Sequence, residues 1–236
     1  MKANRLHFLI TAGGTREYID PVRFITNASS GIMGCALANA ALKAGHRVTL
    51  ISTLENAETL FNSKYGTHYF VGKFISVIGR DETYSPSSRD FKNIFVESAE
   101  DMFKAVKANF KKCDCLIMAA AVSDYTPAKK SKIKIKKSKE SIILKLKPTT
   151  DILKWAGEHK RHQFVVGFAL EDRNLRKNAE KKMQSKNLDM IIANSPSAIG
   201  SEKSTVQIKR KNSDWRILPK ADKSFLAKRI INLLAL

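Results

Sequence analysis

Short apolar runs alternate with stretches of helical periodicity along most of the chain. Apolar runs bounded by turn residues predict buried strands, and apolar residues spaced three or four positions apart predict amphipathic helices. The predicted strands cover residues 5–11, 46–52, 94–96, 116–121, 164–168 and 188–193. The predicted helices cover residues 30–44, 98–111, 151–159, 174–187 and 221–234. This alternation favours an α/β fold, a Rossmann-like, doubly wound, mostly parallel sheet with helices on both faces.

Two further segments alternate with a period of two. Residues 132–137 and 141–147 alternate apolar with charged or polar side chains around a polar turn, which predicts a β-hairpin flap over about 129–148. Residues 205–210 and 215–218 predict a second hairpin before the last helix. Residues 56–90 show no clear pattern and include a predicted variable loop. We therefore predict one domain over residues 1–236 that carries a flap.

The composition is that of an ordinary globular protein, with 43% hydrophobic and 27% charged residues. The first apolar stretch, residues 8–10, is too short for a signal peptide, and no run approaches the ~20 apolar residues of a membrane span. We therefore expect a cytoplasmic protein without a membrane partner. The net charge of +20 favours anionic partners. Since no RNA-binding motif with interleaved aromatic residues appears, we expect no nucleic-acid partner.

The three cysteines, Cys35, Cys113 and Cys115, form no disulfide pattern, which is typical of a reducing compartment. Cys113 and Cys115 are separated by one residue, and no His or further Cys follows at ligand spacing. We interpret them as small residues that enter a buried strand and predict no metal site.

Two segments rich in small and polar residues follow predicted strands, where an open α/β sheet binds its ligands. Gly13-Gly14-Thr15 is followed by residues 27–34, and the glycines allow the backbone to approach a phosphate at the start of a helix. A tight turn and a helix cap would explain the glycines equally well. The dinucleotide fingerprint is absent, because about fifteen residues separate the two glycine groups. This insert contains Arg16, Asp20, Pro21, Arg23 and Asn27, which suit an anionic substrate.

Five motifs occur in order along the chain: TAGGTREYIDPVRFITNASSGIMG at 11–34, AAAVSDY at 119–125, KIKK at 134–137, VGFA at 166–169 and KMQSKNLDMIIAN at 182–194. Together they resemble the phosphopantothenate–cysteine ligase family, in its stand-alone bacterial form. The resemblance implies an enzyme of coenzyme A biosynthesis. In that family the carboxylate of 4′-phosphopantothenate attacks the α-phosphate of a nucleotide and releases pyrophosphate. The amine of L-cysteine then attacks the acyl-nucleotidate and releases the nucleoside monophosphate. The Gly-Ile-Met-Gly stretch is more similar to the branch that uses CTP than to the one that uses ATP.

The resemblance also implies site residues. The implied catalytic residues are Asn27, which would donate to a forming oxyanion, with Arg23 and the flap residue Lys134. The implied nucleotide-binding residues are Gly13, Ser29, Gly31, Gly34, Asp124, Lys134, Phe168, Lys182, Lys186 and Asn194. The implied substrate-binding residues are Asn27, Ala120, Ala121 and Asp124. Without the resemblance, the lysines at 182 and 186 would read as a solvated helix face and those at 132–137 as an exposed edge strand.

The chain departs from the family pattern at a few positions. Ile32 replaces a common basic residue, Thr149-Thr150-Asp151 replaces a Pro-Asp pair near the base, and Leu170 stands where Ala is frequent. The resemblance further implies Mg²⁺ bound with the triphosphate and a homodimer whose flap reaches toward the partner's active site. A separate decarboxylase is also expected, since the family's flavin-dependent decarboxylase often precedes the ligase in one chain.

Two other functions are compatible with parts of the sequence. A nicotinamide-dependent reductase would use Tyr125 and Lys129 as a Tyr-x-x-x-Lys pair on one helix and Glu55 at the ribose, but Pro127 interrupts such a helix. A basic RNA- or nucleotide-binding module would explain the net charge and would leave Asn27 and Arg23 without a role.

Overall fold

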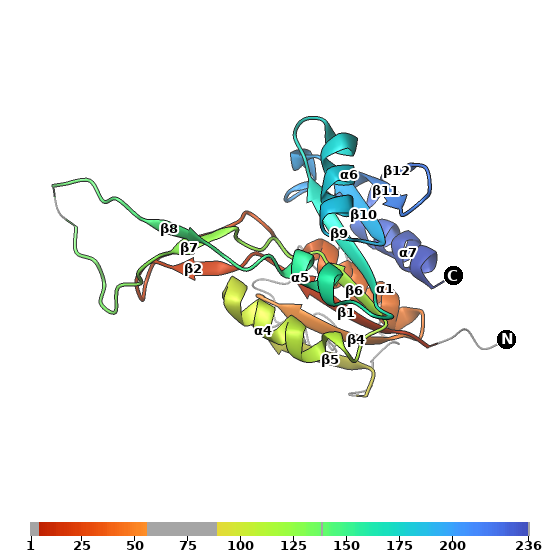
Figure 1. Cartoon of the computed structure of the whole chain (residues 1–236), viewed down its shortest axis with the longest axis horizontal. Coiled ribbons are helices and arrows are strands. Elements are labelled where there is room, and N and C mark those ends of the chain that lie inside the picture. Colours follow the sequence, from red (N-terminus) through yellow and green to blue (C-terminus); the bar gives the residue numbers. More distant parts are fainter. Residues whose placement is uncertain (1–4, 56–88, 138, 236) are drawn as a thin grey trace.

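The computed structural model describes residues 5–55, 89–137 and 139–235. At its centre is an eight-stranded sheet in the order β12-β11-β10-β9-β6-β1-β4-β5 (Figure 1). The strands from β5 to β10 in this order are parallel, and β11 and β12 continue the sheet antiparallel. The sheet strands are β1 (His7–Ala12), β4 (Arg47–Ser52), β5 (Phe91–Phe95), β6 (Cys115–Met118), β9 (Phe164–Leu170), β10 (Met190–Asn194), β11 (Lys203–Arg210) and β12 (Arg216–Asp222).

Helices cover both faces of the sheet, because its strands direct alternate apolar side chains to opposite sides. Phe8 and Ile10 of β1 belong to a core shared with α1 and α7. Leu9 of β1 and Ile51 of β4 belong to a second core, shared with α4, α5 and α6. The helices are α1 (Ile32–Lys43), α4 (Ala99–Phe110), α5 (Ile152–His159), α6 (Leu175–Ser185) and α7 (Lys223–Leu234), with a 3₁₀ turn η1 (Pro196–Ala198). The predicted Rossmann-like, doubly wound architecture is confirmed.

The chain changes direction in the sheet at β1, which pairs with β4 on one side and with β6 on the other. A strand order that reverses in this way opens a crevice at the carboxyl ends of the two strands. The loops after β1 and β6 meet there, since Ala121 donates its N–H to the carbonyl of Gly13 at 2.8 Å. The fold therefore places the two richest motifs of the sequence side by side.

The segments outside the central sheet include short strands that were not predicted. The segment after β1, which showed no pattern, forms a short hairpin of β2 (Arg16–Tyr18) and β3 (Phe24–Thr26). The flap begins after β7 (Tyr125–Pro127) and ends at β8 (Leu146–Pro148). These two strands pair antiparallel, and β2 packs against β7. In Figure 1 these strands and the flap project together from the sheet.

The predicted flap strands at 132–137 and 141–147 are wrong for most of their length. Of the residues described there, only the end of the second segment lies in a strand, at the start of β8. Alternation specifies a strand when one face is buried. Here Ile133 is 76% exposed and Ile143 is 92% exposed, so these alternating side chains pack on no core formed by the described residues.

Most other elements lie within a few residues of their predicted positions. Ser98 caps α4 as predicted, in a capping box with Asp101. The hairpin at the chain end is confirmed as β11 and β12. The strand expected at 94–96 begins earlier, as β5, and β6 ends at Met118 because residues 119–121 turn into the crevice. Most of 56–90, including the proposed variable loop, lies outside the described residues.

Gly157 allows a close contact that supports the crevice. A Cβ atom on this α5 residue would lie 1.9 Å from the carbonyl oxygen of Lys186. We expect Gly157→Ala to lower the free energy of unfolding by roughly 1–3 kcal/mol, because backbone atoms must move apart. Urea unfolding measures this change, with Glu158→Ala on the exposed side of α5 as control. Unchanged or increased stability would contradict the contact, since alanine alone favours a helix.

Candidate active site

A cavity of about 590 Å³ occupies the crevice at the carboxyl ends of the central strands. Its walls come mainly from residues 27–34 before and in the first turn of α1, residues 118–122 and 124 at and after β6, residues 149–153 at the start of α5, and the ends of β9 and β10. Of the residues singled out from the sequence, those that line it are Asn27, Ser29, Gly31, Gly34, Ala120, Ala121, Asp124, Phe168, Lys182, Lys186 and Asn194. The structure therefore brings most of the predicted nucleotide and substrate residues into one cavity.

The glycines after β1 allow α1 to begin close to the strand end. Gly13 has φ of 91° and Gly31 has φ of 72°, and a Cβ on Gly13 would lie 2.1 Å from Oγ1 of Thr53. A Cβ on Gly34 would lie 2.6 Å from that of Ala12. Gly31 and Gly34 line the cavity, whereas Gly13 lies outside the lining and supports Gly31, since a Cβ on Gly31 would lie 3.2 Å from the Gly13 nitrogen.

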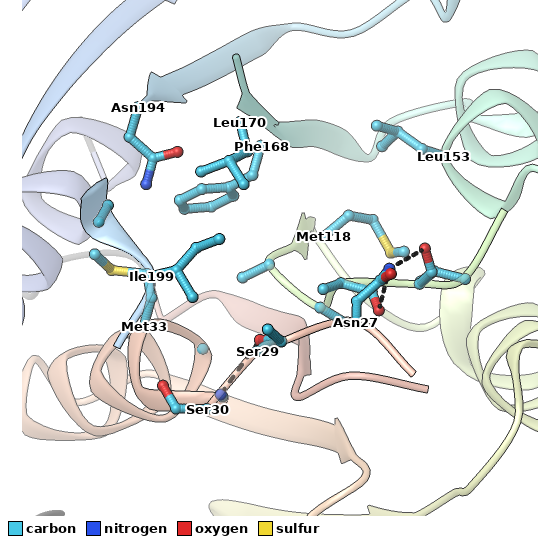
Figure 2. A pocket seen from close by; sticks show the side chains of 18 of the residues that line it. Asn27, Ser29, Ser30, Met33, Met118, Leu153, Phe168, Leu170, Asn194 and Ile199 are labelled. Atoms are coloured by element: carbon cyan, nitrogen blue, oxygen red, sulfur yellow. Dashed lines mark hydrogen bonds between the residues drawn. The ribbon is translucent and has the colours of Figure 1, made fainter. Parts of the chain in front are cut away.

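The first turn of α1 faces the cavity and is suited to an anion. No side chain among the described residues caps it, and none of its residues is acidic. The backbone N–H groups at a helix start carry partial positive charge, which favours phosphate or carboxylate oxygens. Ser29 and Ser30 precede the helix at the cavity floor (Figure 2). This end of the cavity therefore offers N–H and hydroxyl donors.

Asn27 connects the loops after β1 and β6, which meet at the crevice. Its Nδ2 donates to the carbonyl oxygens of Ala121 at 3.3 Å and Val122 at 3.2 Å, as Figure 2 shows. These contacts hold the amide at the junction of the β1 and β6 loops. To donate to an oxyanion, as the family resemblance implies, the amide would exchange one of these carbonyls for the ligand.

Lys182 of α6 and Lys186, the residue that follows α6, line the cavity, as the family resemblance implied. Lys182 donates to the carbonyl oxygen of Phe168 at 2.8 Å, and Lys186 forms an ion pair with Asp151 at 2.8 Å. Burial, and then the neighbouring charge of Lys186, lower the pKa of Lys182 from its ordinary value. Asp151 also caps α5 by accepting from the Lys154 N–H at 3.0 Å. An anionic ligand in the cavity would neutralise the positive charge of these lysines.

The far wall is apolar with one amide. Phe168 and Leu170 of β9 lie near Asn194 at the end of β10, with Ile199 and Met33 close by (Figure 2). A flat ring, an aliphatic side chain and an amide are suited to hold a heterocyclic base by packing and by hydrogen bonds to its edge.

Arg23 and Lys134 do not line this cavity. Arg23 donates through Nη2 to the carbonyl oxygen of Ile135 at 2.6 Å and through Nε to Asp20 at 3.0 Å. The N–H of Ile135 donates to Asp20 at 3.1 Å. We call Asp20, Arg23 and Ile135 the flap anchor. It fixes the backbone next to Lys134, whose own side chain is exposed. The structure thus separates two predicted catalytic residues from the cavity.

Asp20 serves the flap anchor, which corrects its interpretation as a group for an anionic substrate. The residue is 1% exposed, and its carboxylate also accepts from the N–H groups of Val22 and Arg23. Burial opposes the charged form, but the hydrogen bonds from Arg23 and from the N–H groups of Val22 and Ile135 hold the pKa of Asp20 well below its usual range. The carboxylate is therefore charged and fully engaged within the chain.

Replacing Asp20 by alanine is expected to release the flap. The Asp20→Ala variant loses the charge-assisted hydrogen bonds to Arg23 and Ile135, so trypsin should cleave after Lys134 and Lys136 about tenfold faster. Mass spectrometry of a timed digest measures this rate. The control is Asp214→Ala, which removes an exposed carboxylate from the β11–β12 turn. Equal cleavage in the two variants would show that the flap does not depend on Asp20.

Lys223 lines the cavity but was not singled out from the sequence. One pattern in the sequence indicates it. The buried residues of α7 recur at helical spacing as Lys223, Leu226, Ala227, Ile230 and Ile231, so a lysine occupies the first position of an apolar stripe.

Other features restrict the chemistry of the described residues. They contain no group of three or more His, Cys, Asp or Glu that could hold a metal ion, and Cys35, Cys113 and Cys115 are free, buried thiols. Tyr125 lies in β7, so it shares no helix with Lys129, which contradicts the reductase alternative. None of the helices described is long and apolar enough to span a membrane.

Comparison with known proteins gives consistent results. The family model for the DNA/pantothenate metabolism flavoprotein C-terminal domain matches residues 3–65 and 72–236. The coenzyme A biosynthesis bifunctional protein CoaBC of Bacillus subtilis is 40% identical over 226 residues, which are 93% of this chain and 49% of that protein. The CoaBC of Thermococcus kodakarensis is 34% identical over 228 residues, 94% of this chain and 49% of that protein. The chain therefore spans about half the length of these relatives.

A solved structure shares the whole fold. The crystal structure of the C-terminal domain of a CoaBC protein superimposes with a TM-score of 0.73 at 33% identity, over 100% of this chain and 97% of that one.

Proposed function

The chain belongs to the family of DNA/pantothenate metabolism flavoprotein C-terminal domains, and from this premise we propose that it is a phosphopantothenate–cysteine ligase of coenzyme A biosynthesis. One observation carries the proposal. Most of the residues that the family resemblance assigns to a nucleotide and all of those that it assigns to an acyl substrate line the same cavity. An adenylate- or cytidylate-forming ligase requires this proximity, because the carboxylate must reach the α-phosphorus of the nucleotide.

In the first step a carboxylate oxygen of 4′-phosphopantothenate attacks the α-phosphorus of CTP. A bond forms between carboxylate oxygen and phosphorus, and the bond to pyrophosphate breaks. Negative charge increases on the phosphate oxygens, and the first turn of α1 with Lys182 and Lys186 provides donors and cations in advance. Since these groups are already oriented by the fold, little reorganisation is needed when the charge develops.

In the second step the amine of L-cysteine attacks the acyl carbon, and the bond to CMP breaks. The carbonyl oxygen carries negative charge in the tetrahedral intermediate. Asn27 lies at the junction of the two loops and is the proposed donor to this oxygen. Ala120, Ala121 and Asp124 line the cavity beside it and form the proposed substrate wall.

Mg²⁺ enters as part of the nucleotide substrate. The carboxylates among the described lining residues are Asp124, Asp151 and Glu171, and Asp151 is paired with Lys186. Mg²⁺ prefers octahedral oxygen ligands and is commonly held by phosphate oxygens and water with one or two carboxylates. This sparse carboxylate set fits an ion held mainly by the triphosphate.

We also propose that the active enzyme is a homodimer in which one subunit's flap completes the partner's cavity. Arg23 and Lys134 lie outside the cavity of their own chain, and the flap exposes apolar side chains such as Ile133 and Ile143. A second copy of this chain would cover these side chains and bring the flap lysine to the nucleotide.

Mixed dimers test this arrangement. Under the proposal, the Asn27→Asp and Lys134→Gln proteins are each inactive alone. A heterodimer of the two has one cavity in which Asn27 and Lys134 are both intact only if each flap acts on the cavity of the partner. Random mixing should therefore restore about a quarter of the wild-type activity, because half of the dimers carry one intact site of two. No recovery after subunit exchange, or a monomer by light scattering, would contradict the proposal.

Pyrophosphate release tests the function itself. The assay contains 4′-phosphopantothenate, L-cysteine and Mg²⁺, and compares CTP with ATP. Release that requires phosphopantothenate, with CTP faster than ATP, is the expected result. Faster release with ATP would correct the nucleotide and keep the ligase. No release with either nucleotide would contradict the ligase.

A further inference from the structure

Lys223 is a buried cation for which the described part of the chain provides no counterion. It is the first residue of α7, is 5% exposed and lines the cavity. Burial alone lowers the pKa of Lys223 from its ordinary value. Among the described residues, no carboxylate forms an ion pair with it, whereas Lys186 is paired with Asp151 and Lys182 senses the charges of Glu171, Asp151 and Asp124.

This position is unfavourable for a lysine unless an anion is present. Removing an ammonium group from water without a partner destabilises a protein. The start of a helix also repels a cation, because its free N–H groups carry partial positive charge. The other buried residues of the same α7 face are Leu226, Ala227, Ile230 and Ile231, so an apolar residue would suit the packing. Stability of the fold therefore does not explain Lys223.

The fold places Lys223 beside the anion-binding end of the cavity. Arg210 lies opposite Met190, the first residue of β10, and donates to the carbonyl oxygen of Leu233 near the end of α7. The end of α7 therefore lies at the amino edge of the parallel strands. Its first residue is consequently at the carboxyl edge, where α1 also begins. The two helices pack against each other. Residues 27–34 carry no charged side chain.

We propose that Lys223 binds a phosphate oxygen of the nucleotide at the end of the cavity formed by the starts of α1 and α7. The α1 turn supplies N–H donors there, and Lys223 supplies the cation. Lys182 and Lys186 serve the opposite side of the ligand. The inference rests on the proposed function for the identity of the ligand as a nucleotide.

Binding measurements with a matched pair of variants test this role. Lys223→Met removes the ammonium and keeps an unbranched side chain, and Lys228→Met makes the same change at an exposed position of α7. Calorimetry gives the dissociation constants of CTP, ATP, cytidine and inorganic pyrophosphate. We expect Lys223→Met to raise the dissociation constants of CTP and pyrophosphate about tenfold or more and to leave that of cytidine unchanged, because only the phosphates lose a charged donor. Lys223→Arg should retain most of the affinity.

The outcomes separate this inference from the proposed function. If CTP binds Lys223→Met and Lys228→Met equally, or if cytidine is weakened as much as CTP, the phosphate role is overturned. If wild type binds neither CTP nor ATP, the proposed function fails, and the pyrophosphate measurement still decides whether Lys223 holds a phosphate. Thermal unfolding checks the fold, and we expect Lys223→Met to be at least as stable as wild type without ligand.

Discussion

The Asn27→Asp enzyme is expected to release pyrophosphate once per site and then to stop with the acyl-cytidylate bound. An aspartate at this position faces the carbonyl oxygens of Ala121 and Val122, which accept from the wild-type amide. It supplies no N–H donor to the oxyanion of the second step. Loss of one such donor slows a reaction by about 100-fold or more. Activation depends on donors to phosphate, which the substitution leaves in place.

Rapid quench and mass spectrometry would measure the accumulated intermediate against the burst of pyrophosphate. Asn232→Asp is the control, since it makes the same change in charge on the exposed face of α7. Turnover of Asn27→Asp at the wild-type rate would remove Asn27 from the mechanism. A variant that releases no pyrophosphate would place the residue in activation instead.

The Lys134→Gln enzyme is expected to lose pyrophosphate release by about 100-fold or more, because a cation no longer meets the charge that develops on the phosphates. Lys134 is exposed and makes no hydrogen bond with other described residues, so the substitution should leave the unfolding midpoint unchanged. The flap anchor holds the neighbouring Ile135 and does not involve the lysine side chain. A loss of activity would therefore report on chemistry and not on the fold.

Lys136→Gln provides the matched control, as an exposed lysine on the same flap. Steady-state pyrophosphate release and the urea midpoint of both variants decide the result. If Lys134→Gln releases pyrophosphate at a rate within about twofold of that of Lys136→Gln, any of the flap lysines suffices and the flap acts only by its general charge.

Much of the sheet could be predicted because its strands and helices bury regular apolar patterns. The run at β1 and the periodicity of α1 are determined locally, and the helix cap at Ser98 is a short-range interaction. The two segments after β1 and β6 could be placed at the crevice because parallel strands bring their carboxyl ends to one edge, whereas the other cavity residues were implied by the family resemblance. Their chemical roles stay predictions.

The parts that could not be predicted depend on contacts between distant segments. The β2–β3 hairpin has three-residue strands, too short for a visible period, and its contact with the flap joins Arg23 to Ile135. The flap alternates like a strand, but among the described residues neither of its faces is buried, so the alternation does not specify a strand. Lys223 lies almost two hundred residues after Asn27, and only the fold of α7 against α1 shows that both line one cavity.

The walls of the cavity extend from Asn27 to Lys223, so almost the entire chain must be in place before the cavity exists. During synthesis α7 follows all the other walls of the cavity, and until that helix docks one side of the cavity is missing. Ligand binding is thereby reserved for molecules that have finished folding. Since a ligand that binds only the native state stabilises it, the nucleotide pool of the cell would protect molecules in which α7 has docked and leave the others open to proteases.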